Sequence, residues 1–482
     1  MPQLSRTAKA SFLAIGRISD FSAFLIISIF LSRLLSKEEY ATFRQTLLTY
    51  QLVSPLLSLG LPAAILYFLP RTPEKARSTI VEILLVVAGT GGAFSLFMLS
   101  GGAEVVAEQF NNPELTQSLE AFAYYPLFTL PSALIVPTLV TQDKALLIPF
   151  FSLWIAVVRL ISATLPIFLI SKESVYAAQG IVIGSVMIFV SVIVTLNNKL
   201  PKQSVKLEFE HTLKLVRYSF PISLGTVVAT VNKNIDKFLV ATFAGPSTFA
   251  VFVNGAIEIP LMEIISGSAS QILLPETSLL YEQKEYGRAV DLFRRSTIKC
   301  ALILFPISTF AFSVAPEMMV LLYGEEYRES AFFFRAYTLL MPNRIMVWGT
   351  LLNASGNTKI AFNRALLGTV INLIGSIVLI KTIGVIGVVI MTVTTILIFN
   401  SIFNDYHVRR IYGETVFNKK TSGFLGLILL ISILAPTVTG IFFERLAFSE
   451  ISSTSTEKIF VKFTINLILY GNLFFIFRRK IK

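Results

Sequence analysis

Long apolar blocks alternate with short polar connections along almost the whole chain. A helix of about 20 apolar residues spans the hydrocarbon core of a bilayer, and most of the blocks have about that length. The pattern predicts fourteen spanning segments, at 12–33, 45–69, 79–100, 119–140, 146–170, 175–196, 219–243, 248–274, 298–322, 331–352, 360–380, 384–404, 422–443 and 459–477. No connection is long enough to form a domain of its own. We therefore expect an all-α integral membrane protein of about 14 transmembrane helices.

The composition agrees with this pattern. Of the 482 residues, 54% are hydrophobic and 15% are charged, whereas about 25% are charged in an ordinary soluble protein. The two histidines fall in polar connections, where neither is expected to meet a carboxylate on a helix face. With these and a single cysteine, the chain has too few ligands for a Cys/His metal site. We expect no metal and no cofactor, apart from a coupling H⁺ or Na⁺.

The net charge of +12 is unevenly distributed between alternate connections. The set that includes both termini holds 25 Lys and Arg residues, whereas the opposite set holds nine, including Arg44. Because basic residues favour the cytoplasmic side of a membrane, both termini are predicted to be cytoplasmic in a cell membrane (inner or plasma membrane). The basic loops then face anionic lipid, and no folded domain offers a surface for nucleic acid.

Two stretches of the chain resemble each other at an offset of 209 residues. Tyr40 and Phe43 align with Phe249 and Phe252, and the helices that follow are interrupted in both cases by Pro and Gly. These interruptions supply the hinge candidates, which are Pro55, Gly60, Pro260 and Gly267. The repeat predicts two six-helix bundles, at 1–200 and 201–410, followed by an extra helix pair and a basic tail at 411–482.

Charged residues inside the predicted spans point to the functional site, because each costs about 2.5–3.5 kcal/mol at the centre of a helix. The candidate substrate-binding cations of a cavity are Arg17, Arg159, Lys233, Lys237 and Arg344. The candidate ion-coupling or cavity acids are Asp20, Asp236, Glu258 and Glu263. Two local pairs are also expected, since Asp20 follows Arg17 by three residues and Asp236 follows Lys233 by three. Such pairs, or snorkelling to the interface, would leave some of these residues with purely structural roles.

The positive excess suits an anionic ligand, because guanidinium groups bind phosphate oxygens in bidentate fashion. Bent helices permit two bundles to rock about a site near the midplane, as in alternating access. The sequence contains no GxxxxGK[ST] loop and so gives no sign of ATP hydrolysis. No catalytic residue is predicted, and we expect a protein that is not an enzyme.

The stretches FLSRLLSKEEYATF (30–43), LGLPAAILYFLPR (59–71) and NIDKFLVATFAGPSTFAVF (234–252) resemble the polysaccharide flippases. These Wzx-like proteins belong to the multidrug/oligosaccharidyl-lipid/polysaccharide (MOP) exporter superfamily. The resemblance implies that the chain moves an isoprenoid-pyrophosphate-linked oligosaccharide from the cytoplasmic to the outer leaflet, for surface polysaccharide biosynthesis. The partners it implies are that lipid-linked substrate, the bilayer and other polysaccharide-assembly proteins.

Three other functions remain open from the sequence. A cation-coupled multidrug exporter of the same superfamily would have a mostly acidic and aromatic cavity. A membrane glycan polymerase or ligase would need a long outer loop, and the longest one here, 101–118, has no Lys or Arg. A non-transporting assembly scaffold would have a dry, fully packed interior.

Overall fold

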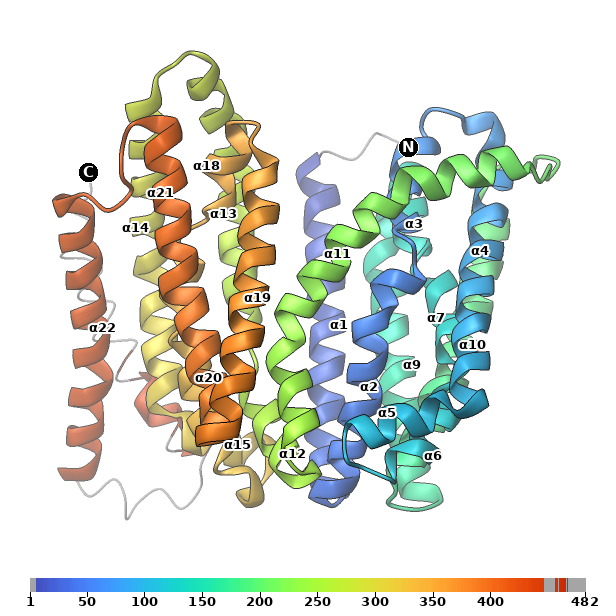
Figure 1. The fold of residues 1–482 in the computed structure, drawn as a ribbon, viewed down its shortest axis with the longest axis horizontal. Helices are drawn as coiled ribbons and strands as arrows, with labels where there is room; N and C mark the ends of the chain where they lie inside the picture. Colours follow the sequence, from blue (N-terminus) through green and yellow to red (C-terminus); the bar gives the residue numbers. More distant parts are fainter. Residues whose placement is uncertain (1–5, 446–455, 458, 465, 467–482) are drawn as a thin grey trace. The chain divides into compact units, whose positions relative to one another are not determined.

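A computed structural model describes residues 6–445, 456–457, 459–464 and 466, and these residues form helices and no strands (Figure 1). They divide into two compact units, Met1–Ala250 and Val251–Lys482. The helix Phe209–Phe243 packs within the first unit, and the expected bundles at 1–200 and 201–410 remain a prediction.

The helices of the first unit follow the predicted spans, with several breaks inside them. In chain order they are α1 (Arg6–Leu34), α2 (Lys37–Leu57), α3 (Leu61–Phe68), η1 (Pro73–Lys75), α4 (Ala76–Phe97), η2 (Met98–Gly102), α5 (Ala103–Gln109), α6 (Leu115–Phe122), α7 (Tyr125–Ser132), α8 (Ile135–Thr141), η3 (Ala145–Leu147), α9 (Ile148–Leu169), α10 (Ser174–Lys199) and α11 (Phe209–Phe243).

The helix α12 (Pro246–Gly255) crosses the boundary, and the rest belong to the second unit. They are α13 (Pro260–Glu282), α14 (Tyr286–Ser313), α15 (Ala315–Tyr323), η4 (Glu325–Tyr327), α16 (Ser330–Thr338), α17 (Met341–Ile345), α18 (Gly349–Ala354), α19 (Thr358–Ile383), α20 (Val385–Thr394), the π-helical η5 (Thr395–Phe399), α21 (Asn400–Tyr412) and α22 (Lys419–Arg445).

Six helical segments of the described chain are long and apolar enough to cross a membrane, and eight are if each of two bent pairs counts as one span. This count is lower than the expected fourteen. Helix breaks shorten several of the predicted segments, such as 331–352, which contains α16, α17 and α18. Most of the final expected span, 459–477, lies outside the described residues. The chain is thus a multi-pass membrane protein.

Large apolar side chains remain exposed along the helices, as expected for surfaces that face lipid. On α9 they form a stripe of Leu153, Val157, Ile161, Leu165 and Phe168, which are between 42% and 62% exposed. Their spacing of three to four residues places them on one helix face. Such a continuous apolar stripe is unusual on a soluble protein.

The bend between α2 and α3 shows how the sequence interrupts a span. The two helices meet at 40°, directly after Pro55, which cannot donate a hydrogen bond within α2. Gly60 has the left-handed φ of 68°, and a Cβ there would lie 2.5 Å from the carbonyl oxygen of Ser219. Only glycine therefore allows α11 to approach this turn so closely.

In the first unit, α11 crosses α4 and α3 at one end and then runs along α2 (Figure 1). The prediction of a shorter segment at 219–243 was therefore incomplete, since one helix of 35 residues runs from Phe209 to Phe243. The hydroxyl of Ser223 donates to the carbonyl oxygen of Pro55 at 2.7 Å. Near the other end, Asn111 donates to the carbonyl oxygen of Thr242 at 3.0 Å. These bonds fix α11 to the first unit.

The positions that align in the sequence repeat are all buried. Tyr40 and Phe43 at the start of α2 are at most 1% exposed, and Phe249 and Phe252 in α12 are fully buried. Each of these helices is followed by a break, at Ser58–Gly60 and at Ala256–Ile259. The repeat itself remains a prediction.

Candidate functional site

In the first unit, Arg159 of α9 forms an ion pair with Asp20 of α1. The shortest N–O distance is 3.9 Å, and the two side chains are 35% and 52% exposed. The predicted local pair of Asp20 with Arg17 remains a prediction, because the side chain of Arg17 lies outside the described residues. A pair so long and so open contributes little to stability, and both groups are accessible to a ligand.

Aromatic side chains lie beside this pair. Tyr50 of α2 meets Tyr125 of α7 edge to face at 4.9 Å, and Tyr125 stacks on Phe122 at 4.3 Å. The guanidinium of Arg159 is close enough to the Tyr50 hydroxyl to interact with it electrostatically. The sequence could not single out these rings among 15 tyrosines and 41 phenylalanines, apart from the hint that Tyr125 precedes Pro126 at a helix break.

On α11, the buried carboxylate of Asp236 pairs with Lys237. Asp236 is 3% exposed, and its Oδ1 accepts the backbone N–H of Lys237 at 2.7 Å and lies 3.6 Å from that residue's Nζ. The expected pairing with Lys233 was therefore wrong in its partner, and Lys233 itself is exposed. A buried pair of this kind is expensive to break, because either charge alone would remain desolvated.

In the second unit, Arg344 and Glu258 are joined at two helix interruptions. Arg344 Nη2 donates to both carboxylate oxygens of Glu258, at 2.6 and 2.5 Å. Glu258 lies in the non-helical stretch Ala256–Ile259, and Arg344 is the penultimate residue of α17. The expected segment 248–274 is interrupted at this stretch, as Pro260 predicts, because proline disfavours helical geometry in the residue before it.

A second arginine, Arg364 of α19, lies near this pair. The guanidinium groups of Arg344 and Arg364 are close enough to repel each other electrostatically. Within the described part of the chain, the buried Nε of Arg364 has no hydrogen-bond partner. The buried Oδ1 of Asn343 is also unsatisfied there. Two guanidinium groups and one carboxylate leave a net positive charge with unused donors, which suits an anion with several oxygens. Arg364 falls within the expected segment 360–380 but was not among the candidate site residues.

The remaining candidates are one acid and the four expected hinge residues. The side chains of Glu263 and Pro260 lie outside the described residues. Gly267 lies within the continuous helix α13 and has no atom within 4 Å of where a Cβ would stand. Pro55 and Gly60 adjoin the bend described above. A hinge role for these residues remains a prediction.

A contact between a histidine and a carboxylate lies away from these clusters, where the connection 200–208 meets α4. His211 Nδ1 lies 2.6 Å from Glu82 Oε2, and the side chain of Glu82 is 2% exposed. Glu82 Oε1 also accepts the backbone N–H of Glu208 at 3.0 Å. The expectation that neither histidine meets a carboxylate was wrong, because the partners are 129 residues apart in the chain. This pair anchors the start of α11 to α4.

Arg44 is also more deeply placed than expected. It was counted among the residues of an outer connection, yet it lies inside α2 and is 7% exposed. Its guanidinium donates to the hydroxyls of Tyr40 and Ser28, at 2.8 and 3.3 Å, and lies over the ring of Phe24. These contacts give Arg44 a structural role in the packing of α2 on α1.

The fold of the chain is similar to those of several solved membrane proteins. The structure matches one described as the lipid II flippase MurJ in an inward closed conformation, with a TM-score of 0.74 and 17% identity over 98% of this chain and 100% of that chain. It matches an inward-facing multidrug resistance MATE family transporter of the MOP superfamily with a TM-score of 0.65 and 14% identity, over 84% and 98% of the two chains.

A MOP superfamily transporter from Pyrococcus furiosus, described as having a binding pocket of reversed polarity, matches with a TM-score of 0.57 and 16% identity, over 83% and 94%. No curated protein sequence matches the chain significantly. A family model described as polysaccharide biosynthesis protein matches residues 30–332, which is more than half of the chain.

The class that the fold defines is a multi-pass membrane protein with the architecture of the MOP superfamily transporters. Within that class, the chain belongs to the polysaccharide biosynthesis protein family. The resemblance found in the sequence is thereby confirmed. The family and the fold are those of transporters and flippases.

Proposed function

We propose that this protein is a flippase that moves an isoprenoid-pyrophosphate-linked oligosaccharide from the cytoplasmic to the outer leaflet by alternating access. The observation that carries the proposal is the ion pair of Glu258 and Arg344 at two helix interruptions, with Arg364 of α19 nearby. Interrupted helices provide the polar backbone groups of transporter binding sites, and two guanidinium groups match the oxygens of a pyrophosphate. The lipid tail would remain in the bilayer while the charged head crosses.

The pair Asp20–Arg159 supports the proposal from the first unit. An open cation beside the rings of Tyr50 and Tyr125 offers both a charge for a phosphate and apolar faces for a sugar. Asp236 is the best candidate for coupling to H⁺ or Na⁺, because its carboxylate is buried in a membrane protein. The family assignment supports polysaccharide biosynthesis as the process. We further propose that both termini are cytoplasmic, as the distribution of basic residues predicts, and that other polysaccharide-assembly proteins are partners.

A cation-coupled exporter of small molecules is the second candidate. It is favoured by the half-exposed carboxylate of Asp20 beside two tyrosine rings, a combination that suits a cationic ligand. The arginines that adjoin both carboxylates, Asp20 and Glu258, count against it, because they would repel a cation.

The test is mass spectrometry of lipid extracts from a strain that lacks the protein. A lipid-pyrophosphate oligosaccharide should accumulate while the matching surface glycan is lost. The wild-type gene should reverse both changes, whereas a variant with Arg159→Ala and Arg344→Ala should not. Arg328→Ala is the control, because Arg328 forms an exposed pair with Glu325 outside the site. An unchanged lipid pool, in a strain with no second flippase, would overturn the proposal.

A further inference from the structure

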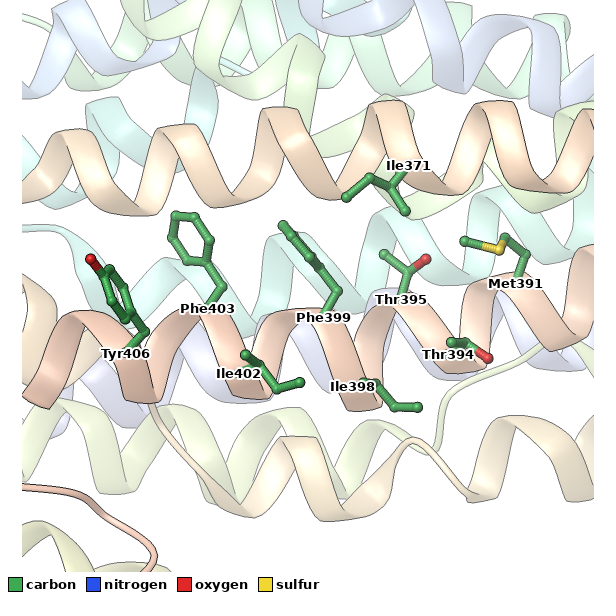
Figure 2. A pocket seen from close by; sticks show the side chains of 9 residues that line it. All are labelled: Ile371, Met391, Thr394, Thr395, Ile398, Phe399, Ile402, Phe403 and Tyr406. Carbon is green, nitrogen blue, oxygen red and sulfur yellow. The ribbon is translucent and has the colours of Figure 1, made fainter.

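An apolar groove runs along the second unit between α19 and the continuous run of α20, η5 and α21. Its volume is about 490 Å³, within the range of about 300–1,000 Å³ that is typical of ligand sites. Ile371 of α19 contributes to one wall, and residues from Met391 to Tyr406 form the other (Figure 2). We refer to it as the α19–α21 groove.

The lining of the groove is hydrocarbon and aromatic. Phe399, Phe403 and Tyr406 follow one another along it, with Ile398 and Ile402 at the rim (Figure 2). The π-helical turn Thr395–Phe399 widens the helix here, and π-turns of this kind are frequent at functional sites. Ile398 and Ile402 are 55% and 65% exposed, so the groove is open along its side to a chain entering from the bilayer.

The length of the groove exceeds what a chain confined to one leaflet needs. From Met391 to Tyr406 the helical run rises about 22 Å at 1.5 Å per residue, and the whole hydrocarbon core is about 30 Å thick. A phospholipid acyl chain stays within its own half of that core. A long isoprenoid chain extends beyond it, and therefore fits the full length of the groove.

Cations lie just beyond one end of the groove. After Tyr406, the last turn of α21 carries Arg409 and Arg410. Arg409 is held by Asp405 at 2.7 Å, whereas Arg410 is exposed and has no hydrogen bond or ion pair to any residue that the structure describes. The charge bias of the sequence predicts that this end faces the cytoplasm. An apolar groove with a free cation at its end complements a lipid that has an anionic head.

We propose that the α19–α21 groove binds the isoprenoid chain of a polyprenyl-phosphate carrier, with the phosphate end beside Arg410. The proposal rests on the proposed function, since it names where the transported lipid is held before its head group enters the Glu258–Arg344–Arg364 cluster. The residues of that cluster do not line the groove.

The test is photolabelling of the purified full-length protein in nanodiscs, with a long-chain polyprenyl monophosphate that carries a diazirine in its tail. Peptides from residues 391–406 should be labelled. Ile371→Trp should reduce this labelling about tenfold, because the indole takes up the volume that the chain needs. Ile374→Trp is the matched control, since Ile374 is an exposed isoleucine of the same helix outside the groove, and should leave the labelling unchanged.

Two further experiments distinguish binding of the isoprenoid tail from binding of the head group and from binding of bulk lipid. Arg410→Gln should weaken labelling by the monophosphate about threefold, as expected for one exposed ionic contact, and leave labelling by an uncharged polyprenol unchanged. Excess unlabelled polyprenyl monophosphate should displace the probe, and excess phosphatidylglycerol should not. Equal displacement by phosphatidylglycerol, or labelling that Ile371→Trp does not reduce, would overturn the groove proposal.

The groove proposal and the flippase proposal can be overturned independently of each other. Labelling at 391–406 in a protein whose deletion leaves the lipid-linked pool unchanged would overturn the flippase proposal and retain the groove. Accumulation of the lipid-linked oligosaccharide on deletion, without labelling of the groove, would overturn the groove alone. Arg344→Ala should retain the labelling, because Arg344 does not line the groove.

Discussion

Arg344 donates to both carboxylate oxygens of Glu258, and each residue lies at the interruption of a helix in the second unit. This relationship links the breaks after α12 and α17 through a single ion pair. Arg364 adds a second positive charge nearby. The three side chains together therefore carry a net positive charge. An anionic ligand would complete the balance of charge.

The two members of this pair should respond differently to substitution. Arg344→Ala should lower export by about tenfold or more, because a lost hydrogen bond to a charged group costs about 1.5–3 kcal/mol. Glu258→Gln should have a smaller effect, since the amide still accepts a hydrogen bond and Arg344 remains available to the ligand. The measurement is the lipid-linked oligosaccharide accumulated in cells that carry each variant. A greater loss in Glu258→Gln than in Arg344→Ala would show that the acid, not the arginine, contacts the cargo.

The pair Asp20–Arg159 should matter for export more than for stability. A double-mutant cycle with Asp20→Ala and Arg159→Ala should give a coupling of about 0.2–1 kcal/mol in thermal unfolding, as for other open ion pairs. Arg159→Ala alone should still reduce export. A coupling of several kcal/mol, or normal export by Arg159→Ala, would make the pair a purely structural contact.

The tight turn between α2 and α3 should not tolerate a side chain. Gly60→Ala combines a left-handed backbone with a contact of 2.5 Å to the Ser219 carbonyl oxygen, and should destabilise the protein by about 2–4 kcal/mol. Gly101→Ala is the control, because Gly101 also has a positive φ but no neighbour within 4 Å, and should cost only about 1 kcal/mol. Thermal unfolding in detergent measures both. Equal shifts would show that strain alone, without the contact to α11, makes Gly60 necessary.

The attachment of the connection 200–208 to α4 should depend on Glu82. Glu82→Ala removes the acceptor of two contacts, from the Glu208 N–H and from His211. Amide hydrogen exchange of the peptide 201–211 should therefore accelerate, by about tenfold for each hydrogen bond of about 1.4 kcal/mol that is lost. Glu74→Ala, at an exposed acid in η1, should leave the exchange unchanged. Unaltered exchange in Glu82→Ala would mean that other contacts hold this segment.

The same connection should also loosen in acid. The hydrogen bond from Lys75 lowers the pKa of the Glu208 carboxyl below its usual 4.5. The ionised form is therefore favoured in the folded protein, and its stabilising contribution is present above pH 4.5 and is lost as the pH falls through the lowered value. Protection of residues 201–208, corrected for the intrinsic pH dependence of exchange, should fall over that range. The fall should be smaller in Lys75→Gln, and an equal fall in both proteins would exclude this pair as its cause.

The sequence predicted the membrane class and the main helices, because hydropathy and charge are properties of short segments. It also predicted bends near Pro55 and Pro260, because proline acts on its own neighbourhood. The sequence could not predict contacts between residues that are distant in the chain. Asp20 pairs with Arg159 and His211 meets Glu82, and both contacts depend on how helices pack.

The proximity of Arg364 to Arg344 also could not be predicted from the sequence. Arg364 falls within the expected segment 360–380, but its neighbours on other helices depend on how the helices pack. Tyr50 and Tyr125 could not be identified from the sequence, because aromatic residues are abundant throughout the chain. Only the packing of α2, α7 and α9 singles them out.

The most direct test of the flippase proposal is transport in proteoliposomes that contain the purified protein and a lipid-pyrophosphate oligosaccharide. A membrane-impermeant glycosidase added outside would report the fraction of glycan that becomes accessible with time. The account predicts that accessibility rises with the wild-type protein and with Arg328→Ala, and that it stays at the level of empty liposomes with Arg344→Ala and Arg364→Ala combined. Equal rates for the wild type and the double variant would contradict the assigned site, and no rise with the wild-type protein, in the presence and absence of H⁺ and Na⁺ gradients, would contradict the flippase function.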